Sequence, residues 1–190
     1  MILIFFGPPG AGKGTQAKFI SKQLDIIHLS TGDILREQLL KKNKLSIKLK
    51  NIIDSGQLVT DDIMNNIIAE RLNEKDCYNG FVLDGYPRTM NQAVFLKNTL
   101  KEKNLIINHI LDFFIDEKTI TQRINSRYIA ENREDDNENV IKTRIAKYFN
   151  ETKPLSDFYK IECSSAYHTI DGNQEIQKLN AEILKIIKKR

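Results

Sequence analysis

Five short apolar runs recur along the 190-residue chain, and longer stretches with helical periodicity separate them. Each run is nearly continuous in apolar character, which is typical of strands that are buried on both faces of a parallel sheet. The alternation of strand and helix predicts an α/β fold with a doubly wound, five-stranded parallel sheet and helices on both of its faces. The predicted strands are Ile2–Phe6, Ile26–Leu29, Phe81–Leu83, Ile110–Ile115 and Tyr167–Ile170.

Two segments do not fit a minimal repeat of strand and helix. Residues from about 31 to 60 have a helical pattern between the second and third strands, and residues from about 127 to 133 form a short polar loop between two helical patterns. The first of them begins with the helix start signal Ser30-Thr31-Gly32-Asp33, which stands before Ile34-Leu35. We therefore expect a single domain that carries one helical insertion and one short loop.

The first predicted strand runs directly into a glycine-rich loop with one lysine, Lys13, and a helical pattern follows from Thr15. This order predicts a P-loop of the NTPase type. Glycines let the backbone N–H groups approach an anion, the positive end of the helix dipole faces the same place, and Lys13 adds a full charge for the outer phosphates. The loop departs from the general pattern in one respect, because Gly14 follows Lys13 and the hydroxyl comes one place later, at Thr15.

Composition narrows the classes of protein that fit. Hydrophobic residues make up 41% and charged residues 28%, as in a soluble globular protein. No apolar run approaches the roughly 20 residues that span a bilayer, and we expect no signal or transit peptide, because the P-loop begins at residue 7. The expected location is the cytoplasm or an equivalent reducing compartment.

Charge and cysteine content argue against two other classes. A net charge of +4, without an arginine-rich run interleaved with aromatic residues, does not indicate a nucleic-acid partner. Cys77 and Cys163 are isolated and no CxxC occurs, so we expect no zinc site and two reduced thiols.

Ligands of doubly wound folds bind at the carboxyl ends of the strands. Asp84 directly follows the run Phe81-Val82-Leu83, and its carboxylate is well placed to hold Mg²⁺, directly or through a water molecule. The alternative role for Asp84 is to cap the turn that follows. His28 lies within an apolar run, so we expect it to have a core or packing role.

Arginines supply an independent indication of phosphate chemistry. Arg123 and Arg127 are four residues apart and share one helical face beside the apolar positions Ile120, Ile124 and Tyr128. Like charges at this spacing repel, and a bound polyanion would offset the repulsion. Arg36, Arg88, Arg133 and Arg144 complete a set that suits a site for two phosphate-bearing molecules. No general base is evident, and transfer to an acceptor that is already an anionic phosphate needs none.

These features resemble the adenylate kinases, a family of nucleoside monophosphate kinases, over essentially the whole chain. The segments that carry the resemblance are Gly7–Gln16, Leu29–Arg36, Asp84–Thr89 with Gln92, and Arg133–Asn137 leading to Arg144. The Gly14-Thr15 arrangement is this family's form of the loop. The resemblance implies a core at 1–29, 60–126 and 134–190, an insertion that binds the nucleoside monophosphate at 30–59, and a short lid at 127–133 without metal ligands.

The resemblance also implies an activity and a set of site residues. The activity is ATP + AMP ⇌ 2 ADP with Mg²⁺, in a monomer whose partners are ATP, AMP and ADP, without a nucleic acid or a membrane. The residues implied for ATP are Gly10, Ala11, Gly12, Lys13, Gly14, Thr15, Arg123, Arg127 and Gly172, the last beside adenine. Those implied for AMP are Thr31, Arg36, Gln57, Leu58, Val59, Gly85, Tyr86, Pro87, Arg88, Gln92, Arg133 and Arg144. Charge on the transferring group would be stabilised by Lys13, Arg88, Arg123, Arg133 and Arg144.

Two residues favour AMP as the acceptor over UMP or CMP, whose kinases share the short lid. Gln92 offers a donor and an acceptor, which suit N1 and the exocyclic amine of adenine. UMP/CMP-type relatives tend to carry asparagine at that position and alanine in place of Thr31. Thr60 stands where the family commonly has proline. The alternatives that stay open are a UMP/CMP kinase, a nucleotide-binding module without phosphoryl transfer, and a kinase for a small neutral alcohol.

Overall fold

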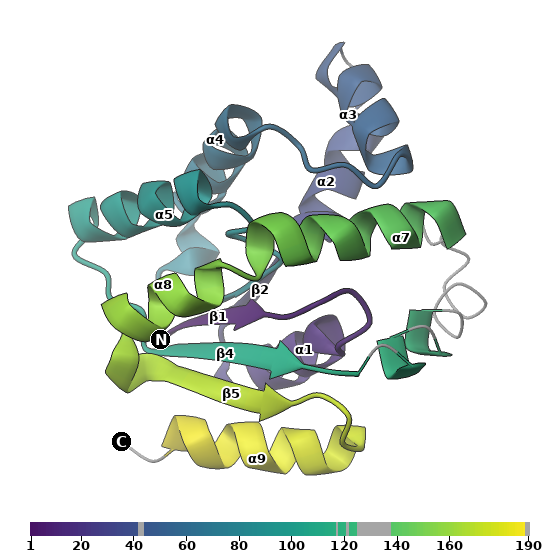
Figure 1. Ribbon diagram of the computed structural model, residues 1–190. Coiled ribbons are helices and arrows are strands. Elements are labelled where there is room, and N and C mark those ends of the chain that lie inside the picture. Colours follow the sequence, from purple (N-terminus) through teal and green to yellow (C-terminus); the bar gives the residue numbers. More distant parts are fainter. Residues whose placement is uncertain (42–43, 117, 121, 125–137, 189–190) are drawn as a thin grey trace.

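The computed structural model describes residues 1–41, 44–116, 118–120, 122–124 and 138–188 (Figure 1). At its centre lies a five-stranded sheet with the strand order β2-β3-β1-β4-β5 and parallel pairing throughout, which confirms the predicted doubly wound α/β fold. The strands are β1 Ile2–Phe6, β2 Ile27–Ser30, β3 Phe81–Asp84, β4 His109–Phe114 and β5 Tyr167–Asp171. β1 has its predicted bounds, and the bounds of the other strands differ from the prediction by one residue.

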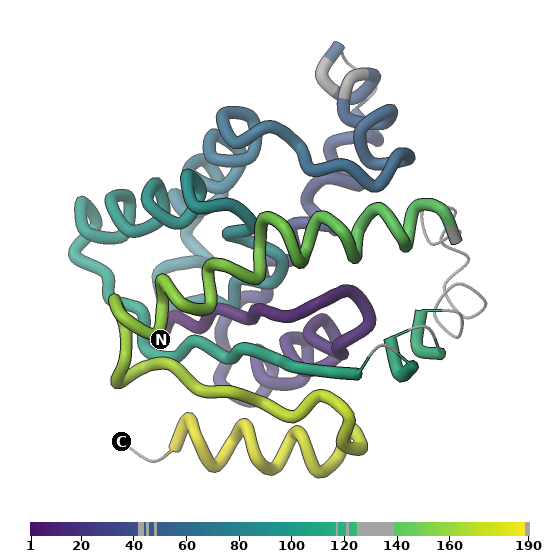
Figure 2. Tube along the Cα trace, in the orientation of Figure 1, coloured from purple at the N-terminus to yellow at the C-terminus, as the bar shows by residue number. Residues whose placement is uncertain are grey.

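Helices connect the strands and cover the sheet. The α-helices are α1 Lys13–Leu24, α2 Thr31–Leu40, α3 Lys44–Asp54, α4 Asp61–Arg71, α5 Met90–Glu102, α7 Glu138–Lys147, α8 Leu155–Glu162 and α9 Ile176–Lys188. Short helical turns are η1 Lys75–Cys77, η3 Tyr148–Thr152 and η4 Ser164–Ala166. Figure 2 traces the chain through these strands and helices, from purple at the N-terminus to yellow at the C-terminus.

The two faces of the sheet bury separate hydrophobic cores, because successive side chains of a strand point to opposite faces. On one face, Phe5 and Leu111 pack with residues of α1 and α9, such as Ile20 and Ile183. On the other face the core joins strand residues to α4, α5 and α8; it includes Ile4, Leu83, Ile110, Ile68, Leu96 and Leu155. The predicted coverage of both faces by helices is confirmed. The carboxyl ends of the strands carry polar residues, such as Ser30 and Asp84.

Two helical elements extend beyond the carboxyl ends of the strands. α2 and α3 pack against each other and project from the body of the protein, while α7 runs across between them and the strand ends (Figure 1). Gly56, which follows α3, has a φ of +71°, and a Cβ at this position would lie 2.9 Å from the carbonyl oxygen of Val140 on α7. α2 and α3 lie within the residues expected for the insertion, 30–59. The lid expected at 127–133 lies outside the described residues.

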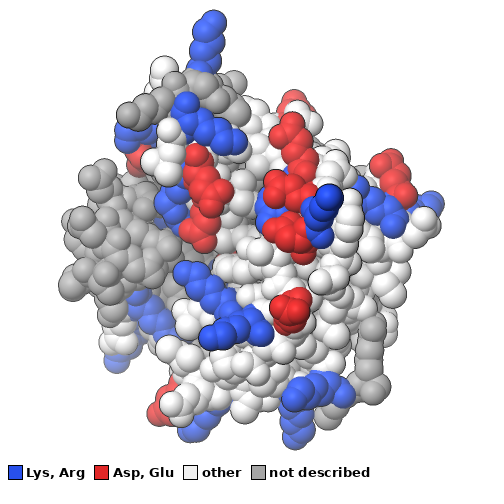
Figure 3. Space-filling view, turned by 180° about the vertical axis from the view of Figure 1, so that it is seen from behind, with Lys and Arg blue, Asp and Glu red and all other residues white. Residues whose placement is uncertain are grey.

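Basic and acidic side chains both lie on the face of the molecule that is turned away from the viewer in Figure 1. Figure 3 shows them in several separate groups on this face, with uncharged surface between them. Among the described helices, none combines the length and the apolar character that crossing a membrane requires.

Candidate active site

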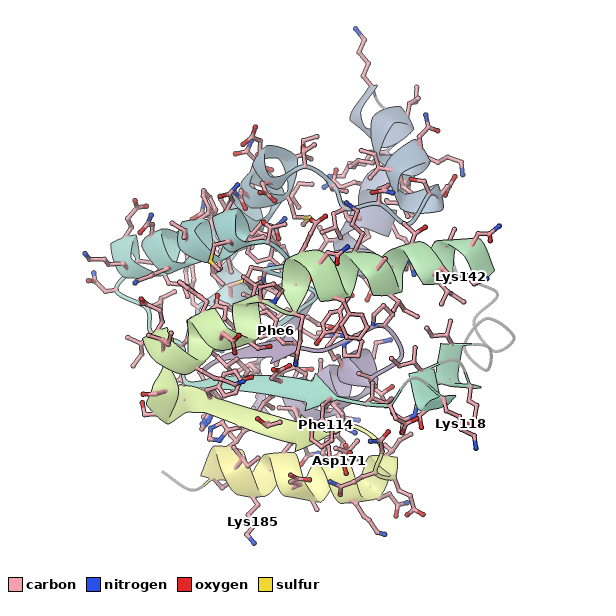
Figure 4. The ribbon with its side chains drawn as sticks, in the orientation of Figure 1. Phe6, Phe114, Lys118, Lys142, Asp171 and Lys185 are labelled. Atoms are coloured by element: carbon pink, nitrogen blue, oxygen red, sulfur yellow. The ribbon has the colours of Figure 1, made fainter. Side chains whose placement is uncertain are left out.

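One cleft collects most of the predicted site residues. It lies at the carboxyl ends of β1, β2 and β3 and has a volume of about 690 Å³. Figure 4 marks the same edge of the sheet, where Phe114 and Asp171 end the neighbouring strands β4 and β5. The predicted residues that line the cleft are Gly10, Gly12, Lys13, Gly14, Thr15, Thr31, Arg36, Gln57, Leu58, Val59, Asp84, Gly85, Pro87, Arg88, Gln92, Arg123 and Arg144.

Other predicted residues lie away from the cleft surface. Ala11 is fully buried, and the fully buried Tyr86 donates its hydroxyl hydrogen to Asn65 Oδ1 at 2.7 Å. Gly172 lies against the P-loop, because a Cβ at this position would stand 3.3 Å from the carbonyl oxygen of Ala11. Arg127 and Arg133 lie outside the described residues.

The P-loop presents backbone N–H groups and a lysine at the start of α1. Gly10 and Gly12 have φ values of +80° and +87°, a region that residues with a Cβ rarely adopt. Gly12 caps α1 without a side chain, so the first N–H groups of the helix are left for an anion. Lys13 Nζ donates to the carbonyl oxygens of Gly7 and Pro8 at 2.7 and 2.8 Å. The ammonium group is therefore held over its own loop.

Asp84 lies directly against the P-loop. Its Oδ2 is 3.4 Å from the point where a Cβ of Gly14 would stand, and 3.2 Å from Nε2 of His28. His28 also lines the cleft. Its interpretation as a core or packing residue missed the contact with Asp84, since that contact depends on the pairing of β2 with β3.

The carboxylate of Asp84 fits a magnesium site that the nucleotide completes. Mg²⁺ usually binds through one or two carboxylates together with phosphate oxygens and water. Within the described ranges, histidine, cysteine, aspartate and glutamate side chains form no cluster of three or more that could hold a metal ion. Asp84 beside the phosphate loop therefore fits an Mg²⁺ ion that phosphate oxygens also bind.

Two arginines from different elements approach each other in the cleft. Burial lowers the pKa of Arg88, the positive charge of Arg144 lowers it further, and Asp84 acts in the opposite direction. Arg88 is held in place, because its Nε donates to the carbonyl oxygen of Gly85 at 2.7 Å and its own carbonyl accepts from Thr152 Oγ1 at 2.9 Å. Two cations brought together in this way favour an anion between them.

Arg36 and Arg123 also line this cleft. Arg36 Nη2 lies 2.5 Å from Asp33 Oδ1. Burial alone would raise the pKa of Asp33, but hydrogen bonds from Arg36 and Ser30 bring it below its usual value. Arg123 donates from Nη2 to the carbonyl oxygen of Gln174 at 3.3 Å and borders Gly12 of the P-loop. Positive charge is thus distributed over two regions, one at the P-loop and one at α2 and α7.

Sequence reasoning also missed part of the cleft wall. Lys147 lies three residues after Arg144 on α7 and forms an ion pair with Glu151 at 2.6 Å. Its spacing from Arg144 was the signal available in the sequence, because residues three apart share a helix face. The other missed wall residues include Lys18, His28, Tyr148 and Thr152.

Comparison with known proteins identifies the family of this chain. The sequence model of the family described as adenylate kinase matches residues 5–164. The chain is 41% identical to the adenylate kinase of Sinorhizobium medicae, over 98% of this chain and 100% of the relative. It is 43% identical to the adenylate kinase of a Cyanothece strain, over 97% and 94% of the two chains, and 42% identical to that of Leptospira biflexa, over 97% and 98%. The chain belongs to the adenylate kinase family.

Proposed function

We infer that the protein catalyses the reversible transfer of the terminal phosphoryl group of ATP to AMP, which yields two ADP. The single observation that carries this function is the cleft, in which the P-loop faces a second cationic region formed by Arg36, Arg88 and Arg144. A protein that only binds or hydrolyses one nucleotide has no use for a second phosphate site. Membership of the adenylate kinase family supports the same reaction.

We assign the P-loop half of the cleft to ATP. The backbone of Gly10, Ala11, Gly12, Gly14 and Thr15 would hold its phosphates, since glycines without Cβ atoms and a helix N-terminus suit an anion. Arg123 and Arg127 would contact ATP, and Gly172, which packs on the loop, would lie beside the adenine.

We assign the opposite half to AMP. The described residues of this half come from α2, the segment before α4, the segment between β3 and α5, the first turn of α5, and α7. The residues of this half are Thr31, Arg36, Gln57, Leu58, Val59, Gly85, Tyr86, Pro87, Arg88 and Gln92, with Arg133 and Arg144. Tyr86 would act through its backbone, because its side chain is buried in the core.

The proposed mechanism is positioning and charge stabilisation without a general base. Lys13, Arg88, Arg123, Arg133 and Arg144 would neutralise charge on the transferring group. Lys13 would leave the carbonyl oxygens of Gly7 and Pro8 for the phosphates, which are stronger acceptors. Asp84 would hold Mg²⁺, directly or through water, and the ion would supply further positive charge to the phosphates. We propose that the protein acts as a monomer in the cytoplasm.

A phosphoryl-transfer assay tests the function. ADP formation from ATP is measured with AMP, UMP, CMP and GMP as acceptors, in the presence of Mg²⁺. We expect turnover that depends on AMP and is far slower with the other acceptors. Preference for UMP or CMP would instead support the UMP/CMP kinase, and ADP formation that is independent of an acceptor would contradict the proposal.

A further inference from the structure

The side-chain amide of Gln92 is bound by the protein at both of its ends. Gln92 is 2% exposed and lies on α5. Its Oε1 accepts a hydrogen bond from the backbone N–H of Arg88 at 2.8 Å, and its Nε2 donates to Oδ1 of Asp61, on the first turn of α4, at 2.9 Å.

These two partners admit only one orientation of the amide. A backbone N–H can only donate, and a carboxylate can only accept. If the amide turned by 180°, Nε2 would face the N–H of Arg88 and Oε1 would face the carboxylate of Asp61. Two repulsive contacts would then replace two hydrogen bonds, one of which is charge-assisted and therefore the stronger. Asp61 and Arg88 thus settle which end of the amide is donor and which is acceptor.

Asp61 is itself held in place. Thr89 Oγ1 donates to the same oxygen, Oδ1, at 2.8 Å, and Thr89 also caps α5 by accepting from the backbone N–H of Gln92. The negative charge of Asp61 is in addition favoured in the first turn of a helix. The network therefore joins the beginnings of α4 and α5 around the amide.

A ligand in the cleft would meet a preset pattern of donor and acceptor. An amide has two N–H groups and two acceptor lone pairs, so Gln92 keeps one of each after its bonds to Asp61 and Arg88. Adenine presents an acceptor, N1, beside a donor, the 6-amino group. A 6-oxopurine presents the reverse, N1–H beside O6, and would match only a flipped amide or a base turned over. A base tied to a phosphate that Arg36 and Arg88 bind is not free to turn over.

We propose that Asp61 is a positioning residue that makes the acceptor site select AMP against the 6-oxopurine nucleotides IMP and GMP, by fixing the orientation of the Gln92 amide. This inference rests on the proposed function, because it concerns the base of the acceptor. It assigns to α4 a part in substrate choice, although Asp61 itself need not touch the base.

The test is Asp61→Asn, which keeps the shape of the side chain but lets position 61 donate as well as accept. kcat/KM is measured for AMP and for IMP with ATP as donor, together with KM for ATP. We expect the preference for AMP over IMP to fall by about tenfold or more, because the amide loses its charged acceptor. KM for AMP should rise by a similar factor, whereas KM for ATP should change less than about twofold. Asp61→Ser serves as a second variant with the same expected outcome.

Asp62→Asn is the matched control. Asp62 is exposed in the same first turn of α4, so this variant removes the same charge from the same helix end. It should leave the preference for AMP unchanged. In a Gln92→Leu background, Asp61→Asn should have no further effect on the preference, since the residue acts through the amide.

The outcomes separate the inference from the proposed function. If the wild-type protein formed no ADP in an AMP-dependent manner, both the proposed function and the role of Asp61 would be contradicted. A wild-type protein that prefers AMP, together with an Asp61→Asn variant of unchanged preference, would overturn the role of Asp61 alone. A wild-type protein that uses IMP as well as AMP would also overturn it, whatever the variants do.

Discussion

At the scale of single residues, Lys13 has the most specific role to test. Its ammonium group already lies over the loop that would hold the phosphates, at 2.7 and 2.8 Å from two loop carbonyl oxygens. Lys13→Met removes the charge and keeps an unbranched side chain. We expect turnover to fall by about 10²–10³-fold, the typical loss for one group that stabilises developing charge, while the circular dichroism spectrum stays the same.

Lys22→Met is the control for this variant. Lys22 lies in the last turn of the same helix, α1, and is exposed. The control should retain wild-type turnover. If Lys13→Met were almost as active as the wild type, Lys13 would have no part in the transfer.

Some contacts of single residues could be predicted from the sequence and others could not. The positions of the P-loop lysine and of the carboxylate that ends β3 could be predicted because their chemistry depends on neighbours in sequence. The hydrogen bond of Gln92 to Asp61 and the contact of His28 with Asp84 join residues 31 and 56 positions apart. Such contacts follow from how α4 packs on α5 and how β2 pairs with β3, which no local pattern encodes.

At the scale of elements, the strands were predictable to within one residue, and the differences at the carboxyl ends of β2, β3 and β5 share a cause. The apolar runs of β2, β3 and β5 end one residue before their backbone pairing does. Ser30 pairs with Asp84, and Phe114 with Asp171, so polar residues close these ladders. A hydrophobic pattern reports burial, whereas a strand is defined by hydrogen bonds. Ser30 and Asp84, the polar last residues of β2 and β3, also line the cleft.

Gly56 lies where the segment after α3 meets α7. Gly56→Ala would put a Cβ into a backbone with φ of +71° and within 2.9 Å of the Val140 carbonyl oxygen. We expect a loss of stability of about 1–3 kcal/mol, measured as the free energy of unfolding in urea. KM for AMP should rise more than KM for ATP, because Gln57 and Leu58 follow this glycine on the cleft wall.

Ser55→Ala tests whether the effect is specific to Gly56. Ser55 is the exposed neighbour, and its hydroxyl donates only to the carbonyl oxygen of Ile52 at 2.9 Å among the bonds described. Its replacement should change stability by less than about 0.5 kcal/mol. Equal behaviour of the two variants would mean that the contact with α7 does not matter for AMP.

At the scale of the whole molecule, the two cores hold the sheet from both faces, whereas the cleft brings cationic side chains together at one edge. Arg88 and Arg144 oppose each other there, so the ligand-free protein carries a repulsion that bound phosphates would relieve. The function therefore links stability to nucleotide binding. A ligand that binds only the folded state stabilises it by about 2.7 kcal/mol at a concentration of 100 times its Kd.

This linkage predicts that the two halves of the cleft raise Tm separately when each binds its nucleotide. AMP alone and a non-hydrolysable ATP analogue alone, each at saturation, should raise Tm by roughly 5–10 °C in thermal unfolding of a chain of this size. Both together should raise it further, because they occupy different regions. Lys13→Met should lose much of the shift caused by the ATP analogue and keep the shift caused by AMP, since Lys13 belongs to the P-loop half. If AMP gave no shift, or if its shift also disappeared in Lys13→Met, the cleft would act as one nucleotide site and the two-substrate function would fail.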